Sequence, residues 1–126
     1  LTGCEIAYDL SLKGKDPAIV EMKNDLIAAK GVCLANSSYL RDYFTLHQTP
    51  VYLETGVKEI TDDGVIAIDK DGQEIFIRGT KVILSVGYKP APIFEEKKNI
   101  HVIGDAYQVG NLRTVIWRAW DIGMKL

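Results

Sequence analysis

Hydrophobic positions at the start of the chain change from helical spacing to a continuous run. Apolar residues recur at helical spacing from Cys4 and stop at Gly14, which predicts a helix that begins beside Gly3. The short apolar run 17–21 ends in the acid Glu21, as expected of a strand buried on both faces of a parallel sheet. The pattern therefore predicts a helix followed by a buried strand.

A second helix is predicted after a short helical turn or loop at residues 24–27. The sequence Asn-Ser-Ser at 36–38 is typical of a helix cap, and helical spacing continues from there to about His47. The apolar side of this helix, which we expect to pack in a core, consists of Tyr39, Leu40, Tyr43, Phe44 and Leu46.

The period changes to two beyond residue 50. Alternating runs occupy residues 51–53, 56–60, 65–69 and 74–78. The pair Asp71-Gly72 separates the last two runs, and such a pair is a strong hairpin signal because both central residues of the tight turn need positive φ. A small antiparallel meander is predicted.

Two more apolar runs and a helix complete the pattern. Residues 81–86 and 100–103 each predict a buried strand, and the second stops at Gly104-Asp105. A last helix is predicted from Asn111 to Gly123. Helix, strand and helix, then a meander, two buried strands and a helix make an α/β fold with a mostly parallel sheet.

Composition narrows the class of protein. A chain of 126 residues corresponds to about one domain, and 15 basic against 17 acidic residues leave a net charge of −2. This balance provides no broad cationic field, so nucleic acid is excluded as an expected partner. No apolar run approaches the ~20 residues that a membrane span requires. Cys4 and Cys33 fit two free buried thiols in a reducing compartment, which predicts a cytoplasmic protein.

The first residues carry a further expectation. The chain begins Leu1-Thr2-Gly3, without an initiator Met or a signal sequence. We therefore expect a fragment of a larger protein, truncated at its N-terminus within a glycine loop.

Gly3 and Glu21 match the second half of a dinucleotide fingerprint. Its glycines let the backbone approach a pyrophosphate at the start of a helix, and an acid about 20 residues later binds the adenine-ribose hydroxyls. In this interpretation Gly3 is the last glycine and Glu21 is the acid. The alternative is a glycine at a helix start and an unrelated surface glutamate.

A second candidate site follows the run 100–103. Asp105 comes directly after this run, and Gly110-Asn111 opens the last helix. A carboxylate in this place can hold a polyol hydroxyl while backbone N–H groups face a phosphate. The alternative is that Asp105 is a loop or capping residue.

These motifs resemble one family in their order along the chain. Residues 3–7, 19–21, 82–90 and 102–106 are similar to motifs of the pyridine nucleotide-disulfide oxidoreductase superfamily. The stretch 104–116 most resembles the C-terminal region of 2-enoate reductases and 2,4-dienoyl-CoA reductases, which are NADH:flavin oxidoreductases. The resemblance covers nearly the whole chain and implies a Rossmann-like FAD/NAD(P)-binding fold with a β-meander crossover.

For residues 1–86 the resemblance implies an NAD(H)-binding domain that lacks its first strand. Gly3 then lies at the pyrophosphate, Glu5 near the nicotinamide and Glu21 at the ribose. Because a carboxylate repels a 2′-phosphate, Glu21 favours NADH over NADPH. Gly87 matches the glycine at the crossing between the two nucleotide domains.

For residues 87–126 the resemblance implies the closing segment of an FAD-binding domain. Gly104 and Asp105 then lie against the ribityl chain and pyrophosphate of FAD, and the backbone from Leu112 to Val115 approaches the flavin. The chain has no barrel for FMN, no cysteine-rich stretch for an iron–sulfur cluster and no redox CxxC motif. We therefore expect no turnover by the isolated chain, no metal site and no catalytic residue.

The expected role of the parent flavoprotein is to transfer hydride from NADH to FAD and to reduce an activated C=C bond. The partners are the two dinucleotides, the remainder of the parent and, at an exposed sheet edge, a second copy. Two alternatives remain: an NADH oxidase or amine dehydrogenase-type flavoprotein, and a non-catalytic nucleotide-binding or interaction module. His47 and His101 are predicted to be structural, and Trp117 and Trp120 to pack in a core or between domains.

Overall fold

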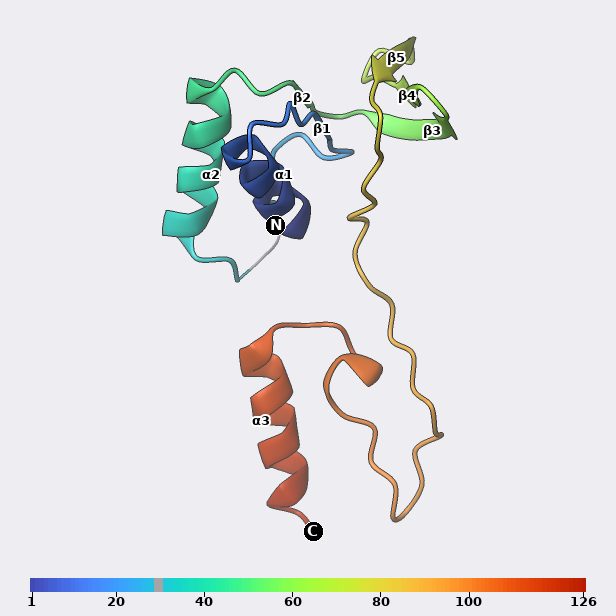
Figure 1. The fold of residues 1–126 in the computed structure, drawn as a ribbon. Coiled ribbons are helices and arrows are strands. Elements are labelled where there is room, and N and C mark those ends of the chain that lie inside the picture. The colour runs from blue at the N-terminus through green and yellow to red at the C-terminus, as the bar shows by residue number, and fades with distance from the viewer. Residues whose placement is uncertain (29–30) are drawn as a thin grey trace. The chain divides into compact units, whose positions relative to one another are not determined.

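The computed structural model describes residues 1–28 and 31–126, which form two units, Leu1–Ser85 and Val86–Leu126 (Figure 1). The first unit contains two helices, a parallel strand pair and an antiparallel sheet. The second contains one short 3-10 helix and one α-helix. Mixed helices and strands confirm the predicted α/β class.

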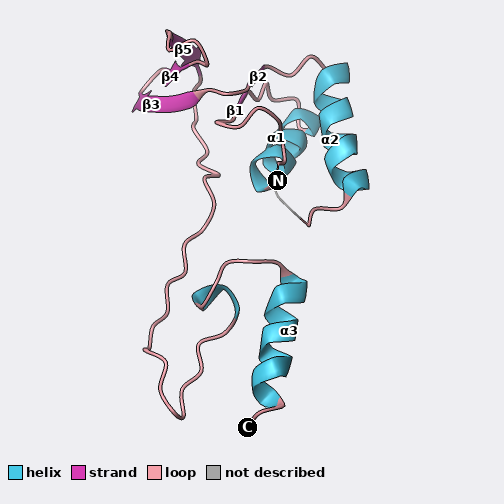
Figure 2. Cartoon of the chain, turned by 180° about the vertical axis from the view of Figure 1, so that it is seen from behind, coloured by secondary structure: helices cyan, strands magenta, loops and turns pink. Residues whose placement is uncertain are grey.

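Two helices lie side by side in the first unit (Figures 1 and 2). Helix α1 spans Thr2–Leu12 and confirms the first predicted helix. Helix α2 spans Leu34–Leu46, so the cap predicted at 36–38 is wrong. Cys33 is the N-cap instead, and the buried Ser37 donates its hydroxyl back to the Leu34 carbonyl at 3.1 Å. Because the Ser37 hydroxyl finds an acceptor within its own helix, Ser37 can lie in the first turns of α2 and does not have to precede the helix as a cap.

Helix α2 connects two parallel strands. Strand β1 (Ile19–Val20) pairs with β2 (Val51–Tyr52), and the register places Ile19 opposite Val51. A parallel pair needs a crossover connection, and α2 provides it. The strand predicted at 17–21 therefore lies in a parallel pair as expected, with two residues in each strand. Its partner is the run 51–53, which was predicted in the antiparallel meander, so that part of the prediction is wrong.

The core of the first unit lies between these helices and the loop after β1. Six buried residues from these three places form one apolar cluster: Cys4, Ala7, Leu26, Ile27, Leu40 and Phe44. Phe44 is 2% exposed and is the largest fully buried side chain among the described residues. The apolar side predicted for the second helix supplies Leu40 and Phe44, whereas Tyr39 and Leu46 are exposed.

The antiparallel meander follows β2. Its strands are β3 (Gly56–Thr61), β4 (Gly64–Ile68) and β5 (Glu74–Arg78), with a bulge in β3 between Val57 and Glu59. Their buried side chains Val65, Ala67 and Ile77 form a second cluster. Ile75 of β5, Val20 of β1 and Tyr52 of β2 pack against it. The predicted meander is confirmed for its last three runs, and its packing joins it to the parallel pair.

The turn between β4 and β5 differs from the tight hairpin predicted at Asp71-Gly72. Only Gly72 has positive φ, at 76°. The Asp69 carboxylate accepts hydrogen bonds from the backbone N–H groups of Asp71 at 2.9 Å and Gln73 at 2.8 Å. Because Asp69 closes the loop from its own side chain, the chain makes a longer turn with one left-handed residue.

The strands predicted at 81–86 and 100–103 are absent. Ile83 is 54% exposed and Val86 88% exposed, and neither run is assigned to a strand. The described part of the chain provides no neighbouring strand for either run, apart from a single bridge between Lys97 and Ile100. An extended segment without a partner has no ladder for its backbone groups. His101, predicted in a buried strand, is accordingly exposed.

The second unit contains η1 (Gly104–Ala106) and α3 (Leu112–Gly123). Helix α3 confirms the last predicted helix, and Asn111 caps it in a capping box with Thr114. Trp117 and Trp120 are each 60% exposed, so their predicted packing in a core is wrong for this unit. Within residues 1–28 and 31–126, no helix has the length and apolar character needed to cross a membrane.

We expect Gly64→Ala to destabilise the protein. A Cβ at Gly64 would lie 2.2 Å from the Ile77 carbonyl oxygen, at a φ of 156°. Overpacking and an unfavourable φ together are expected to lower the free energy of unfolding by about 3 kcal/mol in urea denaturation. Gly56→Ala is the matched control, because a Cβ at Gly56 meets nothing within 4 Å. Equal effects of the two substitutions would contradict this account.

Candidate functional site

The first candidate site lies where β1 and β2 end. Glu21 follows β1 directly, and its N–H donates to the Tyr52 carbonyl at 2.9 Å. Thr55, which follows β2, donates its N–H to the Glu21 carbonyl at 3.0 Å, and Glu54 donates to the Lys23 carbonyl at 2.9 Å. The segments after both strands are therefore tied together at the carboxyl edge of the parallel pair, which is where open α/β sheets bind ligands.

The Glu21 carboxylate is oriented by its own loop. Its Oε1 accepts a hydrogen bond from the Lys23 N–H at 3.0 Å, and the residue is half-buried. Among the hydrogen bonds of the described residues, its second oxygen takes no part. A carboxylate that is held in place and has one free acceptor oxygen is suited to accept hydrogen bonds from the two hydroxyls of a ribose.

The start of α1 is the second part of this site. No side chain caps α1, so the first N–H groups of the helix remain available in the described part of the chain. Gly3 lies in this turn, and a Cβ there would approach the Ser85 Cβ to 3.1 Å and its Oγ to 3.2 Å. Glycine thus permits the close approach of Ser85 to the helix start, beside donors and a partial positive charge that suit a phosphate. Glu5 is exposed in the same turn.

Cys4 is a core residue of α1 rather than a nucleophile. Its thiol is 6% exposed, and burial raises the pKa of Cys4 above its ordinary value of 9.0, with a further contribution from the negative charge of Glu21. A protonated buried thiol is chemically inert. Cys33 is exposed at the start of α2, so the prediction of two buried thiols is wrong for that residue.

The second candidate site belongs to the unit Val86–Leu126. Gly104 has a φ of 62°, and a Cβ on it would lie 3.5 Å from Val115 Cγ1. The Asp105 carboxylate accepts the Gly110 N–H at 3.1 Å through Oδ1, while Oδ2 has no hydrogen bond among the described residues. Gly104, Asp105 and the first turn of α3 therefore lie together, with Leu112 75% exposed at the first position of that helix.

The predicted site residues fall into two groups. Gly3, Glu5 and Glu21 belong to the first unit. The other five belong to the second: Gly87, Gly104, Asp105, Leu112 and Val115. Gly87 has a φ of 87° and open space around it. A glycine is favoured at this position because of the left-handed backbone and not because of a close neighbour.

Sequence reasoning missed several contacts at these sites. Ser85 carries no sequence signal for its approach to Gly3. Arg118 lies over the Tyr107 ring, with its guanidinium carbon 3.2 Å from the ring centroid. This cation–π contact joins α3 to the residue that follows η1. Arg41 binds the loop after β1. Each of these arginines is distant in sequence from the residue it contacts, so no local sequence pattern could have predicted the contact.

The fold and the two helix starts define a class of protein. A parallel βαβ pair with an acid at its carboxyl edge is the architecture of a Rossmann-like nucleotide-binding protein. No cluster of metal-ligating side chains occurs in the parts of the chain that the structure describes.

Comparison with known proteins gives the family. Residues 1–114 match the family described as pyridine nucleotide-disulphide oxidoreductase, and the chain belongs to it. This is a family of flavoprotein oxidoreductases that bind pyridine nucleotides. The predicted family and fold are thereby confirmed.

Two curated relatives are enzymes that match the whole chain. The cinnamate reductase of Clostridium sporogenes is 30% identical over 132 residues, and the NADH oxidase of Thermoanaerobacter brockii is 33% identical over 134 residues. The chain spans 20% of the length of each. A solved structure of a 2-naphthoyl-CoA reductase in complex with 2-naphthoyl-CoA matches 98% of the chain and 19% of its own, with a TM-score of 0.80 at 20% identity. That likeness shows the shared fold.

We expect Gly3 and Ser85 to be energetically coupled. In a Ser85→Gly background, Gly3→Ala should stabilise the protein by up to about 1 kcal/mol, because alanine favours the helix. With Ser85 present the gain should be lost or reversed, since the new Cβ would meet Ser85 at 3.1 Å. Urea denaturation of the double-mutant cycle measures the coupling, and an additive cycle would contradict the contact.

Cys4 should make stability depend on alkaline pH. Because its pKa is raised in the folded protein, unfolded Cys4 loses its proton near 9.0 while folded Cys4 keeps it. The free energy of unfolding therefore falls as the pH rises above 9.0 toward the folded pKa. Denaturation between neutral and strongly alkaline pH should show this component in Cys33→Ser and lack it in Cys4→Ala. An identical pH slope in both variants would exclude the effect.

Proposed function

We propose that this chain is the nucleotide-binding region of an NADH-dependent flavoprotein reductase that reduces an activated C=C bond. The observation that carries the proposal is Glu21, fixed at the carboxyl edge of β1 and β2 in a chain of this family. The first unit binds NADH and the second contributes to the FAD site. The relatives are about five times longer, so the rest of the enzyme supplies the reduction centre.

In the NADH site, each residue has a role suited to its position. The Glu21 carboxylate accepts the adenine-ribose hydroxyls and repels a 2′-phosphate, which favours NADH over NADPH. The start of α1 at Gly3 binds the pyrophosphate through backbone N–H groups. Glu5 lies near the nicotinamide, and Gly87 provides the crossing between the two units.

In the FAD site, the Asp105 oxygen without an internal hydrogen bond suits a ribityl hydroxyl, and the positive φ of Gly104 suits close backbone approach. The backbone from Leu112 to Val115, at the start of α3, faces the flavin. When bound, the two cofactors supply hydride transfer from nicotinamide to flavin. The residues of the chain bind and orient NADH and the flavin end of FAD.

The choice of acceptor rests on the relatives. A relative named cinnamate reductase supports reduction of a 2-enoate, at a centre held elsewhere in the enzyme. A relative named NADH oxidase supports a second candidate, in which NADH is oxidised without an enoate. Anaerobic reduction by NADH followed by mixing with cinnamate or with dioxygen distinguishes them. Rapid reoxidation by cinnamate supports the reductase, and reoxidation by dioxygen alone supports the oxidase.

We expect Glu21→Ala to raise the KM for NADH about tenfold and to reduce the preference for NADH over NADPH, because a hydrogen-bonded carboxylate is lost. Steady-state rates of the whole enzyme with each nucleotide measure both effects. Glu59→Ala is the control, since Glu59 is an exposed carboxylate on β3. Equal or better use of NADPH by the unmodified enzyme would reject the assignment of Glu21.

A further inference from the structure

The loop that carries Glu21 runs from the end of β1 into the apolar core. Its first part is tied to the segment after β2 through Lys23 and Glu54. Its last part buries Leu26 and Ile27, each 6% exposed, against α1 and α2. The loop therefore has two anchors, and the Glu21 carboxylate accepts its hydrogen bond from Lys23, the residue at the first of them.

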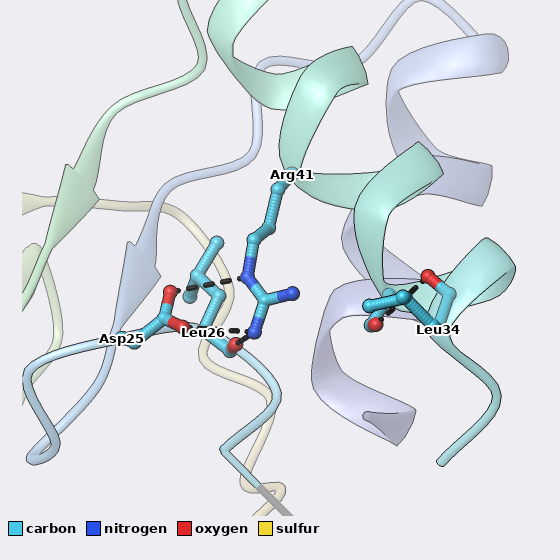
Figure 3. Close-up of polar contacts among 5 residues, drawn as sticks. Asp25, Leu26, Leu34 and Arg41 are labelled. Carbon is cyan, nitrogen blue, oxygen red and sulfur yellow. Dashed lines mark hydrogen bonds and ion pairs between the residues drawn. The ribbon is translucent and has the colours of Figure 1, made fainter.

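Arg41 of α2 binds this loop at three points (Figure 3). Its Nε donates to Asp25 Oδ1 at 3.1 Å and its Nη2 donates to Asp25 Oδ2 at 2.8 Å, which makes a bidentate pair. The same Nη2 donates to the Leu26 carbonyl at 2.5 Å. A planar guanidinium fixes both the distance and the angle of what it binds, which a lysine cannot do.

The loop needs such a restraint because its backbone is strained. Ile27 has a φ of 57°, which is a genuine outlier for a β-branched residue. Glu54, tied to the same loop, has a φ of 50°. Strained residues persist only where surrounding contacts determine them, and they gather at binding sites. Here Ile27 ends the loop that begins at Glu21, and Glu54 lies in the segment that is hydrogen-bonded to that loop.

The other ion pairs of the described residues lie away from this loop. Lys13 pairs with Asp9 along α1, and Lys58 pairs with Glu74 across the meander. The Arg41 side chain is 30% exposed and that of Asp25 55%, so the pair contributes little to global stability. The bidentate pair and the further hydrogen bond to the Leu26 carbonyl indicate instead that Arg41 holds this loop in place locally.

We propose that Arg41 is a positioning residue for the adenosine end of the NADH site. It acts through Asp25 and Leu26 to hold the loop in which Glu21 is oriented. This inference rests on the proposed function, because it takes the Glu21 loop as the adenosine site. It assigns to Arg41 an effect on nucleotides that carry adenosine and none on the nicotinamide end.

The test compares NADH with reduced nicotinamide mononucleotide, which lacks the adenosine half. In the whole enzyme, Arg41→Met should raise the KM for NADH about five- to tenfold with kcat unchanged. The KM for the mononucleotide should stay within about twofold of that of the unmodified enzyme, a change worth less than the loss of one hydrogen bond. Arg41→Lys should give an intermediate KM for NADH, because it keeps the charge and loses the bidentate geometry.

Lys58→Met is the matched control, since it removes an ion pair of the meander and should leave both KM values unchanged. Equal changes for NADH and the mononucleotide, or none for either, would overturn the role of Arg41. If Arg41→Met does not fold, Asp25→Asn and Arg41→Lys decide by the same comparison.

The two proposals can fail separately. An unmodified enzyme that uses the mononucleotide as well as NADH would refute the adenosine site itself. Loss of NADH preference in Glu21→Ala without any change in the Arg41 variants would refute the positioning role alone.

Discussion

The parallel pairing of β1 with β2 is the contact on which the first unit depends. It consists of two residue pairs, so its own hydrogen bonds cannot hold it against chain entropy. Packing supports it from two directions. The cluster between α1 and α2 lies beside Ile19 and Val51, and the meander cluster lies beside Val20 and Tyr52. Both candidate nucleotide contacts of this unit, at Gly3 and at Glu21, depend on that arrangement.

The carboxyl edge of this pair combines rigid and strained elements. Backbone hydrogen bonds join the segments after β1 and β2, while Ile27 and Glu54 adopt left-handed backbone conformations. Such strain costs about 1–3 kcal/mol for each residue and must be offset by packing and hydrogen bonds. Burial of Ile27 in the apolar core offsets part of this cost, and the contacts of Arg41 restrain the same loop locally.

Sequence patterns gave correct results where the relevant contacts are local. Helices α1 and α3 and strand β5 all follow from residues within a few positions of one another. Predictions were wrong where a partner decides the outcome. The apolar runs 81–86 and 100–103 have the composition of strands, yet the described chain places no strand beside either, and Trp117 and Trp120 are exposed for the same reason. A hydrophobic pattern indicates that a segment favours burial, but it does not identify the segment against which it packs.

The sequence by itself determined the class of fold, the family and the glycines and acids of the candidate sites, because these are written as short motifs with fixed spacing. Only the tertiary structure decided that Ser85 lies close to Gly3 and that Arg41 donates hydrogen bonds to Asp25 and Leu26. Those contacts join residues far apart in the chain, and their distances depend on how α1 and α2 pack around the strands. A periodic pattern identifies the faces of each helix, but the contact between two faces exists only once the chain has folded.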